Sequence, residues 1–163
     1  MAHIILFNSL LILCCGYALW RGGTPERIVA VIFLCAGPAT YLVMRAKWDT
    51  AFLDVEMRML LIDTVMLIGL VWLASTANRY WPIWVASLQL ILVAVHGVKA
   101  FDPTLVAWTY AVATGKLAYP QLALLALGTW RHRRRRIETG ADRSWATSLP
   151  PSPVPAPQAR PTA

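Results

Sequence analysis

The chain alternates long apolar runs with short charged links, and this pattern leaves few folds open to it. Five runs rich in Leu, Val, Ile, Ala and Trp cover approximately residues 4–20, 28–44, 57–74, 83–98 and 104–130. A helix that crosses a bilayer needs roughly 17–25 predominantly apolar residues. The pattern therefore predicts an all-α integral membrane bundle of about five transmembrane helices.

The composition indicates that lipid surrounds much of the protein. Apolar residues make up 58% of the chain and charged residues 14%. In a soluble globular domain, about 45–50% of the residues are apolar and about 25% are charged. A water-soluble chain of this size would need more charge to cover its surface, so we expect most of the helical surface to face lipid.

A net charge of +7 would also fit a nucleic-acid-binding protein, but the position of the charge argues against that class. Basic residues directly beside an apolar run are typical of the cytoplasmic flank of a membrane protein, whereas a nucleic-acid site spreads them over a folded face. We therefore expect a bilayer with anionic headgroups as the partner of this basic cluster, and no nucleic acid. The basic cluster consists of Arg131, Arg133, Arg134, Arg135 and Arg136.

The segment that follows the basic cluster differs in composition from the segment that precedes it. Residues 138–163 are rich in Pro, Ala and Ser, and such a segment neither buries a core nor forms a long helix. The sequence predicts a transmembrane domain over residues 1–137 and a disordered cytoplasmic tail over residues 138–163.

The distribution of positive charge over the short links predicts the orientation. With the N-terminus outside, the inner side holds Arg21, Arg27, Arg79 and the basic cluster. Most of the positive charge on the outer links is offset by acidic residues. We therefore expect an inner-membrane protein with its N-terminus outside and its C-terminus in the cytoplasm.

The last apolar run leaves two arrangements open. Residues 104–116 either span the membrane with residues 117–130 or lie at its surface, which would leave a short final span; we prefer five spans. Ala107, Ala111 and Gly115 repeat at four-residue spacing, and small residues in this pattern let a second helix approach closely.

Four polar side chains interrupt the apolar runs and form a candidate intramembrane polar cluster. In the five-span topology Asp63, His96 and Lys116 come to a similar level in the outer leaflet. Gln89 shares a helix face with His96, which follows it by seven residues. An ionisable residue within a span costs roughly 3 kcal/mol on insertion scales, which makes it a candidate functional residue. Such a cluster either joins helices or binds a solute, a proton or a quinone.

The sequence contains none of the common catalytic or nucleotide-binding motifs. We find no serine-nucleophile motif, no HExxH and no phosphate loop. The three cysteines, Cys14, Cys15 and Cys35, lie inside apolar runs without a CxxC pair, as small apolar residues do. We therefore expect no catalytic residues, no metal site and no cofactor.

Three stretches resemble a family of small multi-span bacterial inner-membrane proteins whose activity is uncharacterised. They are CGYALWRGG, RYWPIWVASLQLILVAVHGVKAFDP and YPQLALLALGTW, within about Cys15 to Trp130. The resemblance implies a location in the bacterial inner membrane and implies nothing about activity.

Two functions remain as expectations. The first is a non-catalytic accessory or assembly component that packs on a membrane-protein partner or on a second copy of itself. The alternative is a small carrier or sensor for a solute, proton or quinone that uses Asp63, His96 and Lys116.

Overall fold

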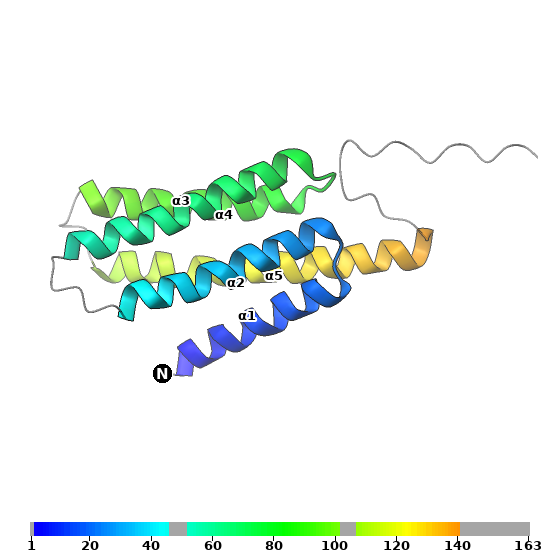
Figure 1. Ribbon diagram of the computed structural model, residues 1–163, viewed down its shortest axis with the longest axis horizontal. Helices are drawn as coiled ribbons and strands as arrows, with labels where there is room; N and C mark the ends of the chain where they lie inside the picture. Colours follow the sequence, from blue (N-terminus) through cyan, green and yellow to red (C-terminus); the bar gives the residue numbers. More distant parts are fainter. Residues whose placement is uncertain (1, 46–51, 102–106, 141–163) are drawn as a thin grey trace, which may run out of the picture.

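The described residues of the computed structural model, 2–45, 52–101 and 107–140, form a bundle of five helices (Figure 1). This confirms the predicted all-α class. The helices are α1 (Ala2–Arg21), α2 (Thr24–Arg45), α3 (Phe52–Thr76), α4 (Trp81–Phe101) and α5 (Ala107–Thr139).

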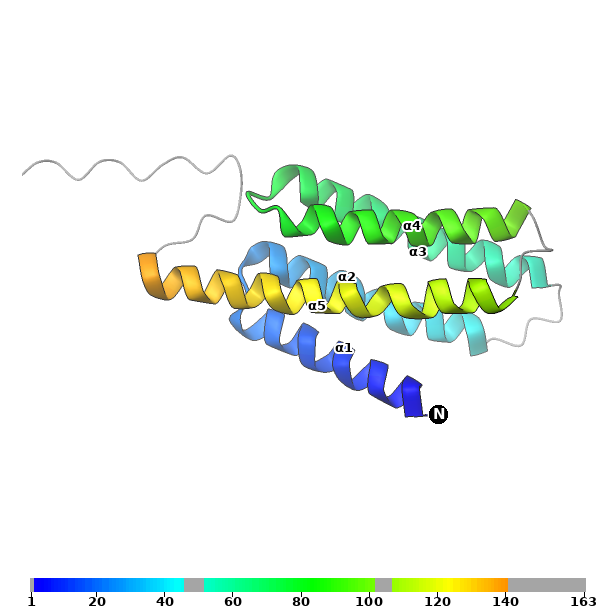
Figure 2. The same cartoon turned by 180° about the vertical axis from the view of Figure 1, so that it is seen from behind.

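Each helix runs antiparallel to the one before it, and α5 closes the bundle by packing against both α4 and α1 (Figures 1 and 2). The α1–α2 turn, the α3–α4 turn and the last turns of α5 therefore lie at the same end of the bundle. We call this the arginine end, because the basic cluster of α5 lies there.

Local sequence signals explain where two of the helices begin and end. Thr24 and Pro25 open α2, and Glu26 lies in its first turn, where the helix dipole favours an anion. At the end of α5, Gly140 has a φ of 73°, and its N–H donates to the carbonyl oxygen of Arg136 at 3.1 Å. A glycine in this left-handed conformation ends an α-helix without steric cost, so α5 stops here.

The bundle has an apolar exterior, while its mostly apolar interior also contains six buried polar or charged residues within the described part of the chain. Large apolar side chains on the outside include Leu13 (70% exposed), Ile5 (66%) and Ile68 (64%). In water this arrangement would leave extensive apolar surface hydrated, whereas in lipid it carries no such cost. The buried polar and charged residues are Glu26, Gln89, His96, Gln121, Thr129 and His132.

Four helices of the described part are long and apolar enough to cross a membrane, and the chain is thus a membrane protein. The candidate spans agree with the first four predicted runs, with ends that differ by a few residues. They are Ile4–Arg21, Thr24–Val43, Met57–Thr76 and Trp81–Lys99.

The fifth predicted span, residues 104–130, differs from the other four. α5 is continuous through Pro120 from Ala107 onward, but it is not among the helices apolar enough to count as a span. Lys116 and Gln121 interrupt its apolar run, and its 33 residues make a helix of about 50 Å, longer than the roughly 30 Å hydrocarbon core.

Parts of three predictions fall outside the described structure. Residues 107–116 are helical and continuous with the rest of α5, whereas residues 104–106 lie outside the described residues. The side chains of the predicted small-residue stripe, from Ala107 to Gly115, also lie outside the description. The predicted tail boundary shifts, because Glu138 and Thr139 still belong to α5; residues 141–163 are not described.

Candidate functional site

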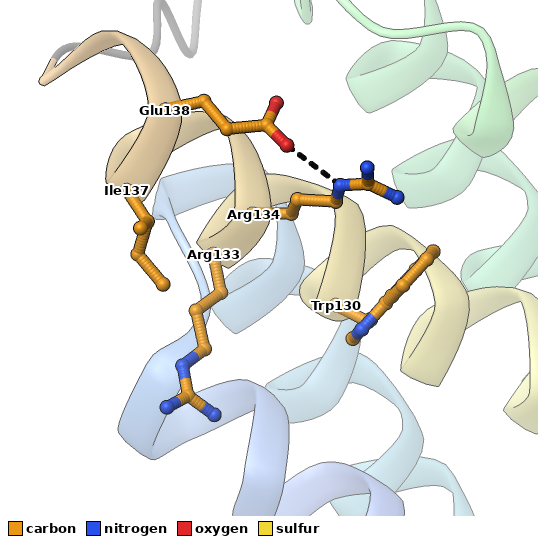
Figure 3. A pocket seen from close by; sticks show the side chains of 5 residues that line it. All are labelled: Trp130, Arg133, Arg134, Ile137 and Glu138. Carbon is orange, nitrogen blue, oxygen red and sulfur yellow. Dashed lines mark hydrogen bonds and ion pairs between the residues drawn. The ribbon is translucent and has the colours of Figure 1, made fainter.

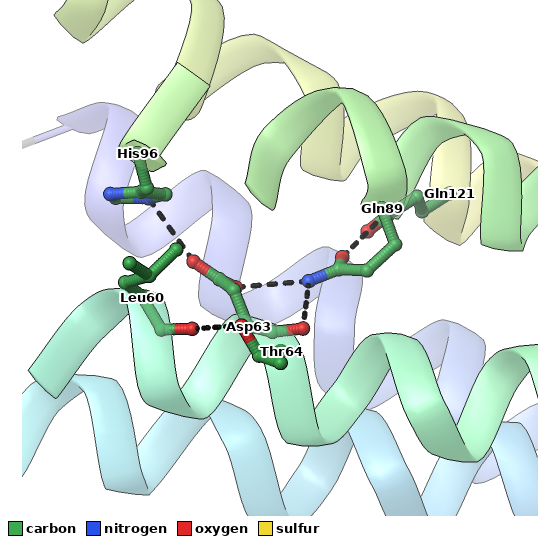
Figure 4. A network of polar contacts seen from close by, with 6 residues as sticks. All are labelled: Leu60, Asp63, Thr64, Gln89, His96 and Gln121. Carbon is green, nitrogen blue, oxygen red and sulfur yellow. Dashed lines mark hydrogen bonds and ion pairs between the residues drawn. The ribbon is translucent and has the colours of Figure 1, made fainter. Parts of the chain in front are cut away.

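Three of the four predicted polar residues meet between α3 and α4 (Figure 4). His96 Nε2 lies 3.1 Å from Asp63 Oδ2. Gln89 Nε2 donates to Asp63 Oδ1 at 3.0 Å and lies 3.2 Å from the backbone oxygen of the same residue. Gln89 and His96 reach the same carboxylate because they are seven residues apart on α4, which is close to two helical turns.

A fourth residue, Gln121 of α5, extends this cluster across the bundle. Its Nε2 donates to Gln89 Oε1 at 2.9 Å. We call Asp63, Gln89, His96 and Gln121 the polar network. Reasoning from the sequence missed Gln121, although an amide inside an apolar run directly after Pro120 is a signal that could have pointed to it.

Lys116, the remaining predicted member, lies apart from the polar network. Its side chain is exposed, and the described bonds of Asp63 go to Gln89 and His96. Lys116 and Gln121 are five residues apart on α5, so they project in directions about 140° apart. Because α5 turns Gln121 toward α4, Lys116 faces away from it.

The members of the polar network satisfy one another inside the bundle. Gln89 is fully buried, Gln121 is 3% exposed and His96 is 7% exposed. A buried amide without partners costs roughly 1–3 kcal/mol, but Gln89 uses its N–H group toward Asp63 and its oxygen toward Gln121. The network therefore joins α3, α4 and α5 through hydrogen bonds, and the Asp63–His96 pair is a place where a proton can be held.

A second polar cluster lies at the arginine end and was missed from the sequence. Glu26 is fully buried, His132 is 4% exposed and the Arg79 side chain is 6% exposed. The Arg79 Nε atom lies 3.8 Å from Glu26 Oε1, and within the described structure neither Glu26 oxygen has a hydrogen bond. In the sequence, Glu26 and Arg79 lie in or beside the short links between apolar runs, and His132 lies among the arginines of the basic cluster. Exposure is the usual outcome at such positions.

Two adjacent glycines make this burial geometrically feasible. A Cβ atom on Gly23 would lie 2.8 Å from His132 Cε1 and 3.0 Å from Glu26 Oε2. Real Cβ atoms do not come this close to a neighbour without displacing it, so α5 approaches the α1–α2 turn here because Gly23 has no side chain. The Gly22–Gly23 pair was the available sequence signal.

A dry apolar layer separates the polar network from the cluster at the arginine end. Its α3 residues lie between Asp63 and the α3–α4 turn that contains Arg79, and its α5 residues lie between Gln121 and His132. Its side chains are at most 1% exposed and belong to the hydrophobic core. The described polar side chains therefore form no continuous path along the bundle. The layer consists of Leu70, Leu73, Val85, Leu122 and Leu125.

The basic cluster lies on the part of α5 that contacts the α1–α2 turn. Arg131, Arg133, Arg134 and Arg136 are exposed, and Arg135 is half-buried. Arg134 Nε lies 2.7 Å from Glu138 Oε1, one turn further along the helix. Within the described residues no group of three or more His, Cys, Asp and Glu side chains is placed to hold a metal ion.

Comparisons with protein-family models, with curated proteins and with solved structures find no match for the chain. The family resemblance expected from the sequence therefore remains a prediction, and the arguments on function that follow rest on the chain's own residues.

Proposed function

We propose that the chain is a non-catalytic, multi-pass inner-membrane protein that acts as an accessory or assembly component by packing on a membrane partner. The closed polar network is the observation that supports this most. Gln89 and Gln121 are buried and bond within the chain, and the dry apolar layer isolates them from the arginine end. The bundle interior is thus occupied by its own contacts, which leaves the outer surface for association.

The outward face of α1 is the surface best suited to such a partner. Asn8, Ile12, Gly16 and Trp20 follow one another at four-residue spacing and are all exposed. A Cβ atom on Gly16 would meet nothing within 4 Å, so the surface is open there. Small residues let a second transmembrane helix approach, and an amide such as that of Asn8 can hydrogen-bond across a helix pair, which lipid tails cannot match.

Replacing Gly16 by leucine is expected to remove the partner without disturbing the bundle. The new side chain points into space that no other part of the described chain occupies, but it would hold a partner helix away. After extraction in a mild detergent, co-purification of the stoichiometric partner should fall at least about fivefold, since lost association of roughly 1 kcal/mol has this effect.

Gly97→Leu on α4 is the matched control, because a Cβ atom at Gly97 also meets nothing within 4 Å. It should retain the partner. Recovery of the unaltered chain alone in several mild detergents would contradict the proposed function.

The alternative function, a carrier or sensor for a solute, proton or quinone, is favoured by one contact, the 3.1 Å pair between Asp63 and His96. A carboxylate and an imidazole at this distance can share and release a proton. This alternative requires that Asp63→Asn abolish a cellular phenotype while the protein still inserts at normal abundance.

For the orientation, we propose an outside N-terminus and a cytoplasmic C-terminus. The antiparallel order brings Arg21, Arg27 and Arg79 to the same end as the basic cluster, and positive charge favours the cytoplasmic side. A membrane-impermeant thiol reagent should therefore label Thr50→Cys, between α2 and α3, in intact cells. It should label Thr139→Cys only after the inner membrane is opened. The reverse pattern would exclude this orientation.

A further inference from the structure

The outer face of α5 carries a shallow hollow of about 200 Å³ just beyond the dry apolar layer (Figure 3). The residues that line it project from the side of the helix opposite His132, which packs into the bundle. All of them belong to α5 and are exposed, so a ligand reaches the hollow from outside the bundle. The lining residues are Trp130, Arg133, Arg134, Ile137 and Glu138.

The packing of α5 fixes the level of this hollow relative to the membrane. His132 lies against Gly23, in the turn between the first two candidate spans, which end at Arg21 and begin at Thr24. Arg133 and Arg134 are the next residues on α5, so they lie where apolar helix surface gives way to water. Trp130 is about one turn deeper, at the depth where tryptophan is enriched in membrane proteins.

The charges of the hollow suit a singly charged anion. Arg133 and Arg134 contribute two positive charges and Glu138 one negative charge, which leaves a net +1. Figure 3 shows Arg134 turned toward Glu138, whereas the Arg133 side chain extends in a different direction with its guanidinium away from this pair. The Arg134 Cζ atom lies 5.7 Å from the Trp130 ring centre, and its Nε atom bonds Glu138. These contacts hold one guanidinium in place while the other is open to a ligand.

We infer that this hollow binds the phosphodiester group of an anionic phospholipid in the leaflet that borders the arginine end. Guanidinium groups form paired hydrogen bonds with phosphate oxygens, and Trp130, 49% exposed, offers an apolar surface to the start of the acyl chains. A lipid is the occupant that places a phosphate at this depth, beside exposed apolar side chains. This goes beyond the general attraction of the basic cluster to anionic membranes, because it assigns binding to two of the five arginines.

The test compares two variants that lose the same charge from the same stretch of helix. Arg133→Gln with Arg134→Gln removes the hollow's arginines, and Arg131→Gln with Arg136→Gln removes two exposed arginines outside it. The full-length proteins are purified in a non-ionic detergent and titrated with phosphatidylglycerol, and bound lipid is counted by native mass spectrometry. Circular dichroism checks that both variants remain folded.

We expect the hollow variant to bind phosphatidylglycerol at least about tenfold more weakly, because a lost charge-assisted contact has an effect of this order. The matched variant should stay within roughly threefold of the unaltered protein, since exposed charges outside the site act only through screened attraction. Phosphatidylcholine should bind more weakly than phosphatidylglycerol to the unaltered protein and lose less in the hollow variant.

Two results would overturn the inference. Equal losses in the two variants, or no loss in either, would show that binding depends on overall charge and not on the hollow. Glycerophosphoglycerol, which has the same phosphodiester without acyl chains, provides the second arm of the experiment. If it binds as tightly as phosphatidylglycerol, the ligand is a soluble phosphate and the assignment to a lipid is wrong.

Discussion

Replacing Gly22 by alanine is expected to destabilise the bundle by roughly 3 kcal/mol, at the upper end of the usual cost of overpacking. The new Cβ atom would overlap the backbone carbonyl oxygen of Ala18 and lie 2.7 Å from Glu26 Cβ. The carbonyl has no easy way to move, because it accepts a hydrogen bond from the Gly22 N–H at 2.8 Å. Relief therefore requires unwinding the last turn of α1 or displacing the start of α2.

Gly16→Ala is the control for this prediction. The position lies in α1 with nothing within 4 Å of the new atom, so alanine should raise stability by about 0.5–1 kcal/mol through its higher helix propensity. Unfolding in a graded mixture of mild and denaturing detergent, followed by circular dichroism, measures both variants. Equal stabilities for Gly22→Ala and the unaltered chain would show that the α1–α2 turn is not as tight as described.

Replacing Asp63 by leucine is expected to destabilise the protein by about 2 kcal/mol, within the range for leaving buried polar partners unsatisfied. The change removes the carboxylate that accepts from Gln89 and pairs with His96, and it leaves Gln89 the backbone oxygen of residue 63 at 3.2 Å as an acceptor. Leucine is accepted by a membrane span, so the loss should appear in the folding of the bundle and not in insertion. The variant should therefore reach the membrane at normal abundance and unfold at a lower fraction of denaturing detergent.

Thr64→Val on α3 is the control for Asp63→Leu, because it changes a residue outside the polar network on the same helix. Thr64 adjoins Asp63, but its hydroxyl donates to the carbonyl oxygen of Leu60, one turn back on α3, at 2.6 Å. This bond connects no second helix, so its loss should change stability by less than about 0.5 kcal/mol, as is usual away from special features. If Thr64→Val and Asp63→Leu lower stability equally, the polar network does not join the helices as proposed.

A double-mutant cycle between Asp63 and Gln89 would measure their coupling directly. Interhelical hydrogen bonds in membranes average about 0.6 kcal/mol and reach about 1.7 kcal/mol in such cycles. A value near the upper end would fit the complete burial of Gln89. The two glutamines and the His96 imidazole make the network one unit, so single substitutions will not add.

The apolar layer between the two polar clusters distinguishes a carrier from an assembly component. The polar network and the cluster of Glu26, Arg79 and His132 lie on opposite sides of the dry apolar layer. A carrier would have to open that layer, at the cost of hydrating fully buried leucines. The proposed assembly role requires no such opening, because a partner would pack on the outer surface of the bundle.

Several features of the structure could be predicted from the sequence because they depend on local periodicity. The four candidate spans follow from runs of apolar residues, since each helix in lipid must be apolar along most of its length. The meeting of Asp63 with Gln89 and His96 follows from helical spacing together with the short link between antiparallel α3 and α4. Neither step requires knowledge of how the rest of the chain packs.

The remaining features depend on how each helix is rotated about its own axis. Whether Gln121 or Lys116 faces the interior is set by the packing of α5 against α1 and α4, and both are polar residues in an apolar run. The burial of Glu26 and His132 likewise requires α5 to lie against the glycines of the α1–α2 turn. Hydrophobicity along the chain was enough to predict helices surrounded by lipid and the order of the four candidate spans. Which polar side chains share the interior depends on contacts between segments far apart in the sequence, and these contacts appear only when the helices are packed together.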